Sequence, residues 1–296
     1  MTGFICIDKP QGLTSFTATN RARAILGAKK AGHTGTLDPM ATGVLPVALS
    51  GASRFIALLP EHEKTYIARV RLGITTDTLD ITGEVTGECP VNVTREQVQK
   101  TVQSFLGESE QLPPMYSAVS QNGVRLYELA RRGETVERKP RHICISELVL
   151  SDMTAAEFTL RVTCSAGTYI RSLAHDIGQK LGTGAVLTAL RRTAANGFTE
   201  KDCVTLEELE CLRDENRLGE VLRPVDACLS AYPALTVTAA QGVRFQNGGD
   251  LLAERVKGLE QAGLYRVYAP ENRFLGLGEL PENGESLLVK RVFVDG

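Results

Sequence analysis

A loop rich in glycine and proline, between Gly32 and Pro46, carries the residues best suited to chemistry. Three glycines and two prolines within these fifteen residues indicate a tightly determined backbone. Asp38 is the only acid in the loop, and His33 lies close to it in the sequence. A carboxylate held on such a loop can act as a nucleophile or as a general base. Asp38-Pro39 is also the usual start of a helix, in which the aspartate only caps backbone N–H groups, and spacing alone leaves both interpretations open.

A second candidate segment surrounds Tyr169 and Arg171. A strand ends at Cys164, Gly167 turns the chain, and a helix begins directly afterwards. Side chains at such junctions often project into a cleft, although a core tyrosine and a surface arginine fit the pattern equally well. If Arg171 reaches Asp38, the pair would keep the carboxylate ionised and oriented.

Other sequence motifs of catalysis are missing. Gly27-Ala28-Lys29-Lys30 does not match a phosphate-binding P-loop, and no GxSxG or HExxH sequence occurs. The seven cysteines include no CxxC and no cysteine–histidine pair at zinc spacing. We therefore expect a reduced protein that binds no metal.

The elements that must position these residues can be predicted from periodicity and capping signals. Residues 65–72 alternate, with Tyr66 on the buried face and Arg69 and Arg71 on the other. Two capping boxes, Thr94 with Gln97 and Thr205 with Glu208, open helices, the first running to Gly107 and the second strongly acidic. Further expected elements are a strand at 3–7, a helix capped by Ser15 and running to Leu26, paired strands at 142–150 and 157–164, and a helix at 170–181.

The chain of 296 residues is long enough for two domains. Strands and helices are interspersed up to about residue 231 without a regular alternation, which indicates an α+β domain. Beyond Ala231-Tyr232-Pro233 the sequence changes to short strand patterns with Gly and Asn turns and little helix signal. We therefore expect one domain at 1–231 and a small β module at 232–296.

Charge is segregated along the chain although the net charge is only −2. Six basic residues face one acid between Lys9 and Arg54, and six face three acids between Gln121 and His142. Between Glu200 and Glu220, eight acids face three basic residues. The net charge, close to zero, excludes a protein that coats nucleic acid through its overall charge. The local basic blocks, in contrast, fit a face that binds a polyanion. Ordinary solvated helix faces would give the same pattern.

No stretch of the sequence predicts a membrane span or a secretory signal. There is no run of about 18 apolar residues, and Asp8 and Lys9 interrupt the N-terminal apolar stretch. We expect a cytoplasmic protein without contact to a membrane.

Several of these segments together resemble the TruB family, the bacterial tRNA pseudouridine-55 synthases. The loop Gly32–Pro46 resembles the signature loop of that family, and further matching segments occur in family order from residue 4 to about 230. They are Asp8-Lys9-Pro10, Lys64-Thr65-Tyr66, Thr76-Asp77-Thr78 with Asp80, Pro113–Val119, Gly123–Arg131, Gly167–Arg171 and Leu190-Arg191-Arg192. The last 65 residues look like the PUA RNA-binding module that many members carry.

The resemblance implies an α+β fold, with a mixed or antiparallel-sheet catalytic domain and a small, β-barrel-like PUA module at the C-terminus. It implies that uridine 55 in the T-loop of tRNA is isomerised to pseudouridine after base flipping, without a cofactor. The partner would be the T-arm of tRNA, and we expect a monomer because no extended apolar seam is visible in the sequence.

The resemblance also assigns roles to individual residues. Asp38 matches the nucleophilic aspartate, Tyr66 the tyrosine that stacks on the base and is implicated in proton removal from C5, and Arg171 the arginine that pairs with the aspartate. His33 matches a histidine that holds the loop, and Lys9, Tyr169 and Leu190 match positions near or lining the substrate pocket. Whether the aspartate attacks ribose or base is left open.

The sequence departs from the family pattern at one position, and two other functions compete with pseudouridine synthesis. Ser120 stands where the family usually has lysine, which removes one basic contact near the RNA. A tRNA-binding folding chaperone would need the same basic surface but no catalysis. A nucleoside hydrolase would release free uracil and would need a second acid near Asp38, for which the sequence offers no obvious candidate.

Overall fold

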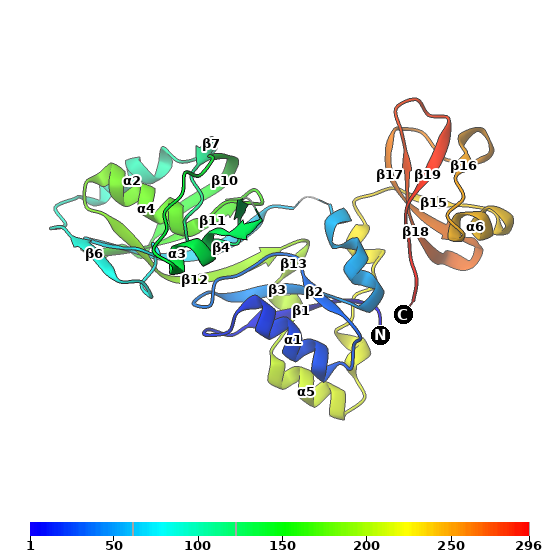
Figure 1. Cartoon of the computed structure of the whole chain (residues 1–296), viewed down its shortest axis with the longest axis horizontal. Helices are drawn as coiled ribbons and strands as arrows, with labels where there is room; N and C mark the ends of the chain where they lie inside the picture. The colour runs from blue at the N-terminus through cyan, green and yellow to red at the C-terminus, as the bar shows by residue number, and fades with distance from the viewer. Residues whose placement is uncertain (61, 122, 296) are drawn as a thin grey trace.

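A mixed ten-stranded sheet forms the first part of the protein, seen in a computed structural model that describes residues 1–60, 62–121 and 123–295 (Figure 1). The strand order is β14-β1-β3-β12-β4-β11-β10-β7, with β13 paired to β12 and β2 paired to β3. Most neighbours are antiparallel, but β14 runs parallel to β1 and β12 runs parallel to β3. The bounds are Gly3–Lys9 (β1), Ala31–His33 (β2), Thr42–Leu49 (β3), Lys64–Leu72 (β4), Gly107–Gln111 (β7), Arg141–Ser151 (β10), Glu157–Cys164 (β11), Ala185–Ala195 (β12), Phe198–Thr199 (β13) and Cys203–Val204 (β14).

Helices pack against this sheet through their apolar faces. One cluster joins α2 and α4 to strands β4, β10, β11 and β12, and another joins α1 and α5 to β1 and β3. The alternation predicted for residues 65–72 is confirmed, because Tyr66 is buried while Arg69 and Arg71 are exposed. The helices are Ser15–Ile25 (α1), Arg95–Gln103 (α2), Leu126–Arg131 (α3), Ile170–Leu181 (α4) and Leu206–Asp214 (α5), with a 3₁₀ segment at Ser50–Leu58 and small hairpins Ile74–Thr76 with Val85–Glu88 (β5, β6) and Ser120–Gln121 with Val124–Arg125 (β8, β9).

Two of the predicted helix ends differ from the structure. The capping boxes at Thr94 and Thr205 are both present, but α2 stops at Gln103 instead of running to Gly107. The cap of α1 is Thr14, whose side chain accepts a hydrogen bond from the Thr17 backbone N–H at 3.0 Å. Ser15, the predicted cap, is therefore free to bond elsewhere.

A small five-stranded sheet follows near the C-terminus, set apart from the main sheet in Figure 1. The expectation of little helix here is wrong, because Thr238 and Gln241 form a capping box that opens helix α6 (Ala239–Gln246). Phe245 of this helix is fully buried against the strands. The α+β architecture with a small β module is as predicted from the sequence. Its strands are Ala234–Thr236 (β15), Leu251–Leu252 (β16), Gly263–Ala269 (β17), Arg273–Leu280 (β18) and Ser286–Val292 (β19).

Aromatic rings join the small sheet to the first part of the chain. The ring of Phe55 lies 6.1 Å from that of Phe274 and 6.3 Å from that of Phe293, measured between centroids. The Tyr268 hydroxyl donates a hydrogen bond to Asp226 at 2.9 Å. Tyr232, at the predicted boundary 231/232, bonds to both parts, since its hydroxyl donates to the Leu58 carbonyl at 3.1 Å and its carbonyl accepts from Arg266 Nε at 2.9 Å.

No helix in the described ranges is long and apolar enough to cross a membrane.

Candidate active site

The Asp38 loop connects β2 to β3 and contains a turn, not the helix start that was one of the two interpretations of Asp38-Pro39. The only helix-like contact is the hydrogen bond from the Ala41 N–H to the Asp38 carbonyl, at 3.0 Å. Ser15, the first residue of α1, holds the loop, since its hydroxyl donates to the Leu37 carbonyl at 3.0 Å and accepts from the Leu37 N–H at 2.7 Å. The Asp38 side chain is consequently not used as a helix cap.

Lys9 holds the same loop from inside the protein. Its side chain is fully buried, and its Nζ donates to the carbonyls of Pro10, Leu13 and Pro39 at 2.9, 2.6 and 3.4 Å. Burial lowers the pKa of Lys9 to about 8, against the opposing effect of the Asp38 charge. Lys9 does not line the cavity described below, so the structure places this residue, expected to bind substrate, behind the loop.

Arg192 of β12 clamps the two ends of the loop. This side chain is fully buried, and it donates from Nε to the Val44 carbonyl at 2.7 Å and from Nη2 to the Gly35 carbonyl at 3.0 Å. Gly43 lies against the same residue with φ of +100°, and a Cβ there would come within 2.2 Å of the Arg192 carbonyl oxygen. Only glycine fits this close approach, which explains one of the three glycines of the loop.

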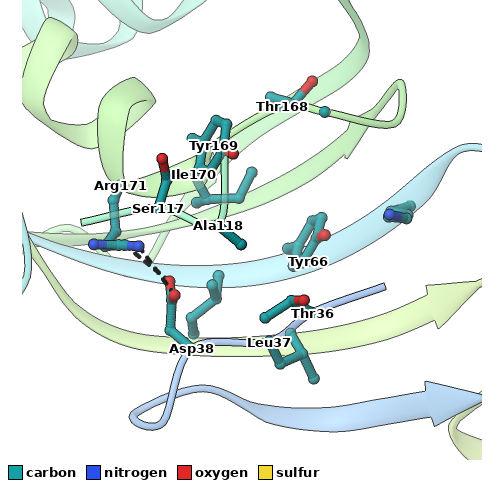
Figure 2. Close-up of a pocket in the computed structure, with 13 residues that line it drawn as sticks. Thr36, Leu37, Asp38, Tyr66, Ser117, Ala118, Thr168, Tyr169, Ile170 and Arg171 are labelled. Atoms are coloured by element: carbon teal, nitrogen blue, oxygen red, sulfur yellow. Dashed lines mark hydrogen bonds and ion pairs between the residues drawn. The ribbon is translucent and has the colours of Figure 1, made fainter. Parts of the chain in front are cut away.

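Arg171 and Asp38 form an ion pair at the floor of a cavity, as Figure 2 shows. Arg171 Nη2 donates to Asp38 Oδ1 at 3.0 Å, and Arg171 Nε lies 2.8 Å from Asp38 Oδ2. The guanidinium also donates to the carbonyls of Thr78 and Tyr116 at 2.9 and 2.7 Å. An arginine fixed by this many acceptors presents a carboxylate in one orientation.

A second carboxylate lies beside the pair. Asp80 Oδ2 is 3.8 Å from Arg171 Nη1, and the Asp80 side chain is almost fully buried. No acidic partner for Asp38 was evident in the sequence, because Asp80 lies 42 positions away and shares Arg171 with it. Asp80 is held by short local bonds, including one from the Thr82 N–H at 2.9 Å.

The environment of Asp38 raises its pKa above the ordinary value of 3.8. Burial is the main cause, and the charge of Asp80 acts in the same direction, while Arg171 and Lys9 oppose them. The effect of Arg171 was expected from the sequence, and the effect of burial on the Asp38 pKa outweighs it. The Asp38 side chain nevertheless remains 32% exposed, and it lines the cavity.

The cavity has a volume of about 250 Å³ and both polar and apolar walls. Of the seven predicted site residues, five line it, whereas Lys9 and His33 do not. His33 lies on β2, half-buried, and burial followed by the Arg192 charge lowers its pKa, so its imidazole is neutral near pH 7. The lining residues are Thr36, Leu37, Asp38, Lys64, Tyr66, Ser117, Ala118, Gly167, Thr168, Tyr169, Ile170, Arg171 and Leu190.

Tyr66 lies in the wall of the cavity on strand β4, opposite Arg192 in the register of β4 and β12. Burial raises the pKa of the Tyr66 hydroxyl, and the positive charge of Arg192 opposes this rise. Arg192 and Lys64 were not predicted as site residues, although both belong to segments that resemble the family. Lys64 lines the cavity, and burial lowers its pKa.

Because Asp38 is the carboxylate that lines the cavity, its protonation should control activity at low pH. We expect the rate of the chemical step to fall on acidification at a pH above the ordinary aspartate value of 3.8, since the folded protein raises this pKa. Asp80→Asn removes one of the charges that raise the Asp38 pKa, so the acid limb of the pH–rate profile should move to lower pH. Single-turnover rates between pH 4 and 8 would check this, and an acid limb that stays in place in Asp80→Asn would contradict it.

Comparison with known proteins identifies the family. The description "TruB family pseudouridylate synthase (N terminal domain)" matches residues 23–170, "tRNA pseudouridylate synthase B C-terminal domain" matches 171–230, and "Pseudouridine synthase II TruB, C-terminal" matches 233–293. The chain is 46% identical over 286 residues to tRNA pseudouridine synthase B of Cupriavidus metallidurans, covering 95% of this chain and 91% of the relative. It is 46% identical over 290 residues to tRNA pseudouridine synthase B of Dechloromonas aromatica, covering 98% and 95%.

Solved structures agree with this assignment. A chain in the crystal structure of a Cbf5-Nop10-Gar1 complex superposes with a TM-score of 0.76 at 26% identity, covering 99% of this chain and 85% of that chain. A chain in the structure of an H/ACA RNP bound to a substrate RNA containing 2'-deoxyuridine gives a TM-score of 0.75 at 25% identity, with the same coverage. The protein is therefore an enzyme that belongs to the TruB family of pseudouridylate synthases.

Proposed function

We propose that this enzyme isomerises uridine 55 in the T-loop of tRNA to pseudouridine, with Asp38 as the nucleophile. The observation that carries the proposal is the Asp38 carboxylate, held by Arg171 at the floor of a cavity beside Tyr66. The names of the relatives supply the tRNA substrate. The test is incubation with an unmodified tRNA transcript, followed by mapping of the modified nucleotide; pseudouridine at another position would contradict the proposed site.

The proposed reaction needs no cofactor because uridine and pseudouridine are isomers. The glycosidic C–N bond breaks, the uracil reattaches through C5, and the proton lost from C5 is balanced by one gained at the freed ring nitrogen. Asp38 holds the intermediate covalently, through ribose or base, while Leu37, Ile170 and Leu190 keep out water that would hydrolyse it. The Tyr66 hydroxyl takes part in removing the proton from C5, passing its own proton on toward the ring nitrogen that gains one.

The target base must leave its stack before it can enter the cavity. Extruding a nucleotide costs a few kcal/mol, and an aromatic side chain repays part of this by stacking on the base. Tyr66 and Tyr169 both line the cavity and can supply such a surface. His33 and Lys9, which lie outside the lining, support the loop rather than the base in this proposal.

The RNA backbone is proposed to bind to the basic segments around the site. A second pocket of about 210 Å³, called the groove here, is lined by Arg138, Lys139 and Arg141 and by Ser120, where the family usually has lysine. We propose that the T-arm of tRNA contacts this groove and the module at 232–296. Phosphate contacts of this kind are weakened by salt.

Salt dependence offers a test of the groove. Lys139→Gln should reduce the slope of log affinity against log salt concentration by about one, the effect of losing one phosphate contact. The matched control is Lys201→Gln, an exposed lysine within the acidic block Glu200–Glu220, which should leave the slope unchanged. Filter binding of tRNA at several salt concentrations measures both; equal slopes in all three proteins would place the RNA elsewhere.

Two rival functions give different products in the same transcript assay. A folding chaperone would leave the tRNA chemically unchanged. A nucleoside hydrolase would release free uracil, and Asp80 now supplies a second acid near Asp38. However, Asp80 faces the cavity only through Arg171, since it is not among the lining residues. We therefore favour isomerisation, and we expect the enzyme to act as a monomer in the cytoplasm.

A further inference from the structure

Two thiols that the proposed reaction does not use lie at one edge of the main sheet. Cys6 belongs to β1 and Cys203 to β14, and the two residues are directly paired in the parallel register of these strands. Their Sγ atoms are 3.0 Å apart, although 197 positions separate them in the sequence. Neither cysteine lines the cavity that contains Asp38.

The backbone already holds the pair at a separation suited to a disulfide. Neighbouring strands lie about 4.8 Å apart, and disulfides are found between Cα atoms separated by about 4.4–6.8 Å. A bond between the two sulfurs therefore requires a movement of about 1 Å by the side chains, because an S–S bond is about 2.0 Å long. The strands themselves need not change their pairing.

The two cysteines differ in how far a reagent in solvent can reach them. Cys6 is 1% exposed, so a reagent cannot reach it directly. Cys203 is partly exposed and lines a separate cavity of about 380 Å³, together with Lys201 and Arg223. A small oxidant that enters this cavity meets Cys203 first, with the Cys6 sulfur directly behind it.

We propose that Cys203 and Cys6 are a reversible oxidation site, at which peroxide converts the two thiols into a disulfide. The Cys203 thiolate attacks one peroxide oxygen, the O–O bond breaks, and Cys203 becomes a sulfenic acid as the leaving hydroxide takes up a proton to give water. The Cys6 sulfur then attacks the Cys203 sulfur, its thiol proton leaves, and the S–O bond breaks to release a second water. One peroxide thus oxidises two thiols, and an added dithiol reverses the reaction.

The disulfide would close a covalent loop that contains Asp38, Tyr66, Arg171 and Leu190. Because it joins strands that are already paired, the proposal predicts an unchanged active site and a folded state that resists unfolding better. Thiols in reducing compartments form disulfides only transiently, so the bond is expected during oxidative exposure and not in the resting protein.

The test uses the full chain with Cys89 and Cys211, the two exposed cysteines, replaced by serine to remove competing reactions. After treatment with hydrogen peroxide, alkylation of the denatured protein and mass spectrometry should reveal a peptide pair linked through residues 6 and 203. Thermal unfolding should shift upward by several degrees, dithiothreitol should reverse the shift, and the single-turnover rate should stay within twofold.

Two variants serve as controls. Cys203→Ser should abolish both the linked peptides and the thermal shift, while Cys228→Ser, at a buried cysteine outside the pair, should retain both. If Cys203→Ser does not fold, Cys6→Ala provides the same comparison. Recovery of Cys203 as a sulfinic acid with Cys6 still reduced would overturn the proposal, and so would linkage of either cysteine to a different partner.

Discussion

An enzyme with asparagine in place of Asp38 should bind tRNA within a few-fold of the wild-type affinity and form no measurable pseudouridine. Asparagine has nearly the same shape and can still accept a hydrogen bond from Arg171, so the cavity keeps its form. It cannot act as an anionic nucleophile, and losing a nucleophile typically costs at least about ten-thousandfold in rate. Carbodiimide labelling of the tRNA followed by mass spectrometry measures the product, and filter binding measures affinity.

The control for Asp38→Asn is Asp80→Asn, which removes a buried carboxylate from the same arginine without removing the group that lines the cavity. We expect this control to retain detectable turnover. Normal turnover by Asp38→Asn would end the nucleophile proposal. Loss of tRNA binding together with turnover would instead indicate that the substitution had disturbed the loop.

Tyr66→Phe should fold normally and lose about a hundredfold to ten-thousandfold of the single-turnover rate. The phenylalanine ring keeps the surface on which a base can stack, but the hydroxyl that is proposed to take part in removing the C5 proton is gone. Release of tritium from tRNA labelled at uracil C5 reports this step directly. Affinity for tRNA should change little, because the ring carries the contact.

Tyr169→Phe is the matched control, since Tyr169 lines the same cavity and belongs to the junction that precedes helix α4. We expect its rate to remain within a few-fold of wild type. If Tyr66→Phe is equally active, the hydroxyl of Tyr66 has no part in proton transfer. If both variants lose the same factor in single-turnover rate, the loss reflects a change in the cavity as a whole and not a role of the Tyr66 hydroxyl.

Local patterns predicted the elements well wherever the signal lies within one segment. The alternation of residues 65–72, both capping boxes and the helix ended by Gly182 are found as expected. A helix start, one of the two interpretations of Asp38-Pro39, does not form because Ser15, Arg171 and Arg192, from elsewhere in the chain, hold the loop in another conformation. Such contacts leave no trace in the local sequence.

The site itself was predicted in part. Asp38 and Arg171 were singled out by their residue types and spacing, and the structure brings them together. Asp80 was quoted only as part of a motif, because its charged partner Arg171 is 91 positions away in the sequence. Lys9 was expected to bind substrate, whereas its buried side chain donates to three backbone carbonyls and does not line the cavity.

The aromatic joint between Phe55, Phe274 and Phe293 limits how the C-terminal module can be exchanged. Phe55 is fully covered, so a chimera built by grafting another module after residue 231 would uncover an apolar ring unless the graft brought matching rings. The same coverage makes simple truncation an unsuitable probe of RNA affinity. Engineers who wish to redirect this enzyme to other RNAs should therefore alter the outer loops of the module and leave its inner face as it is.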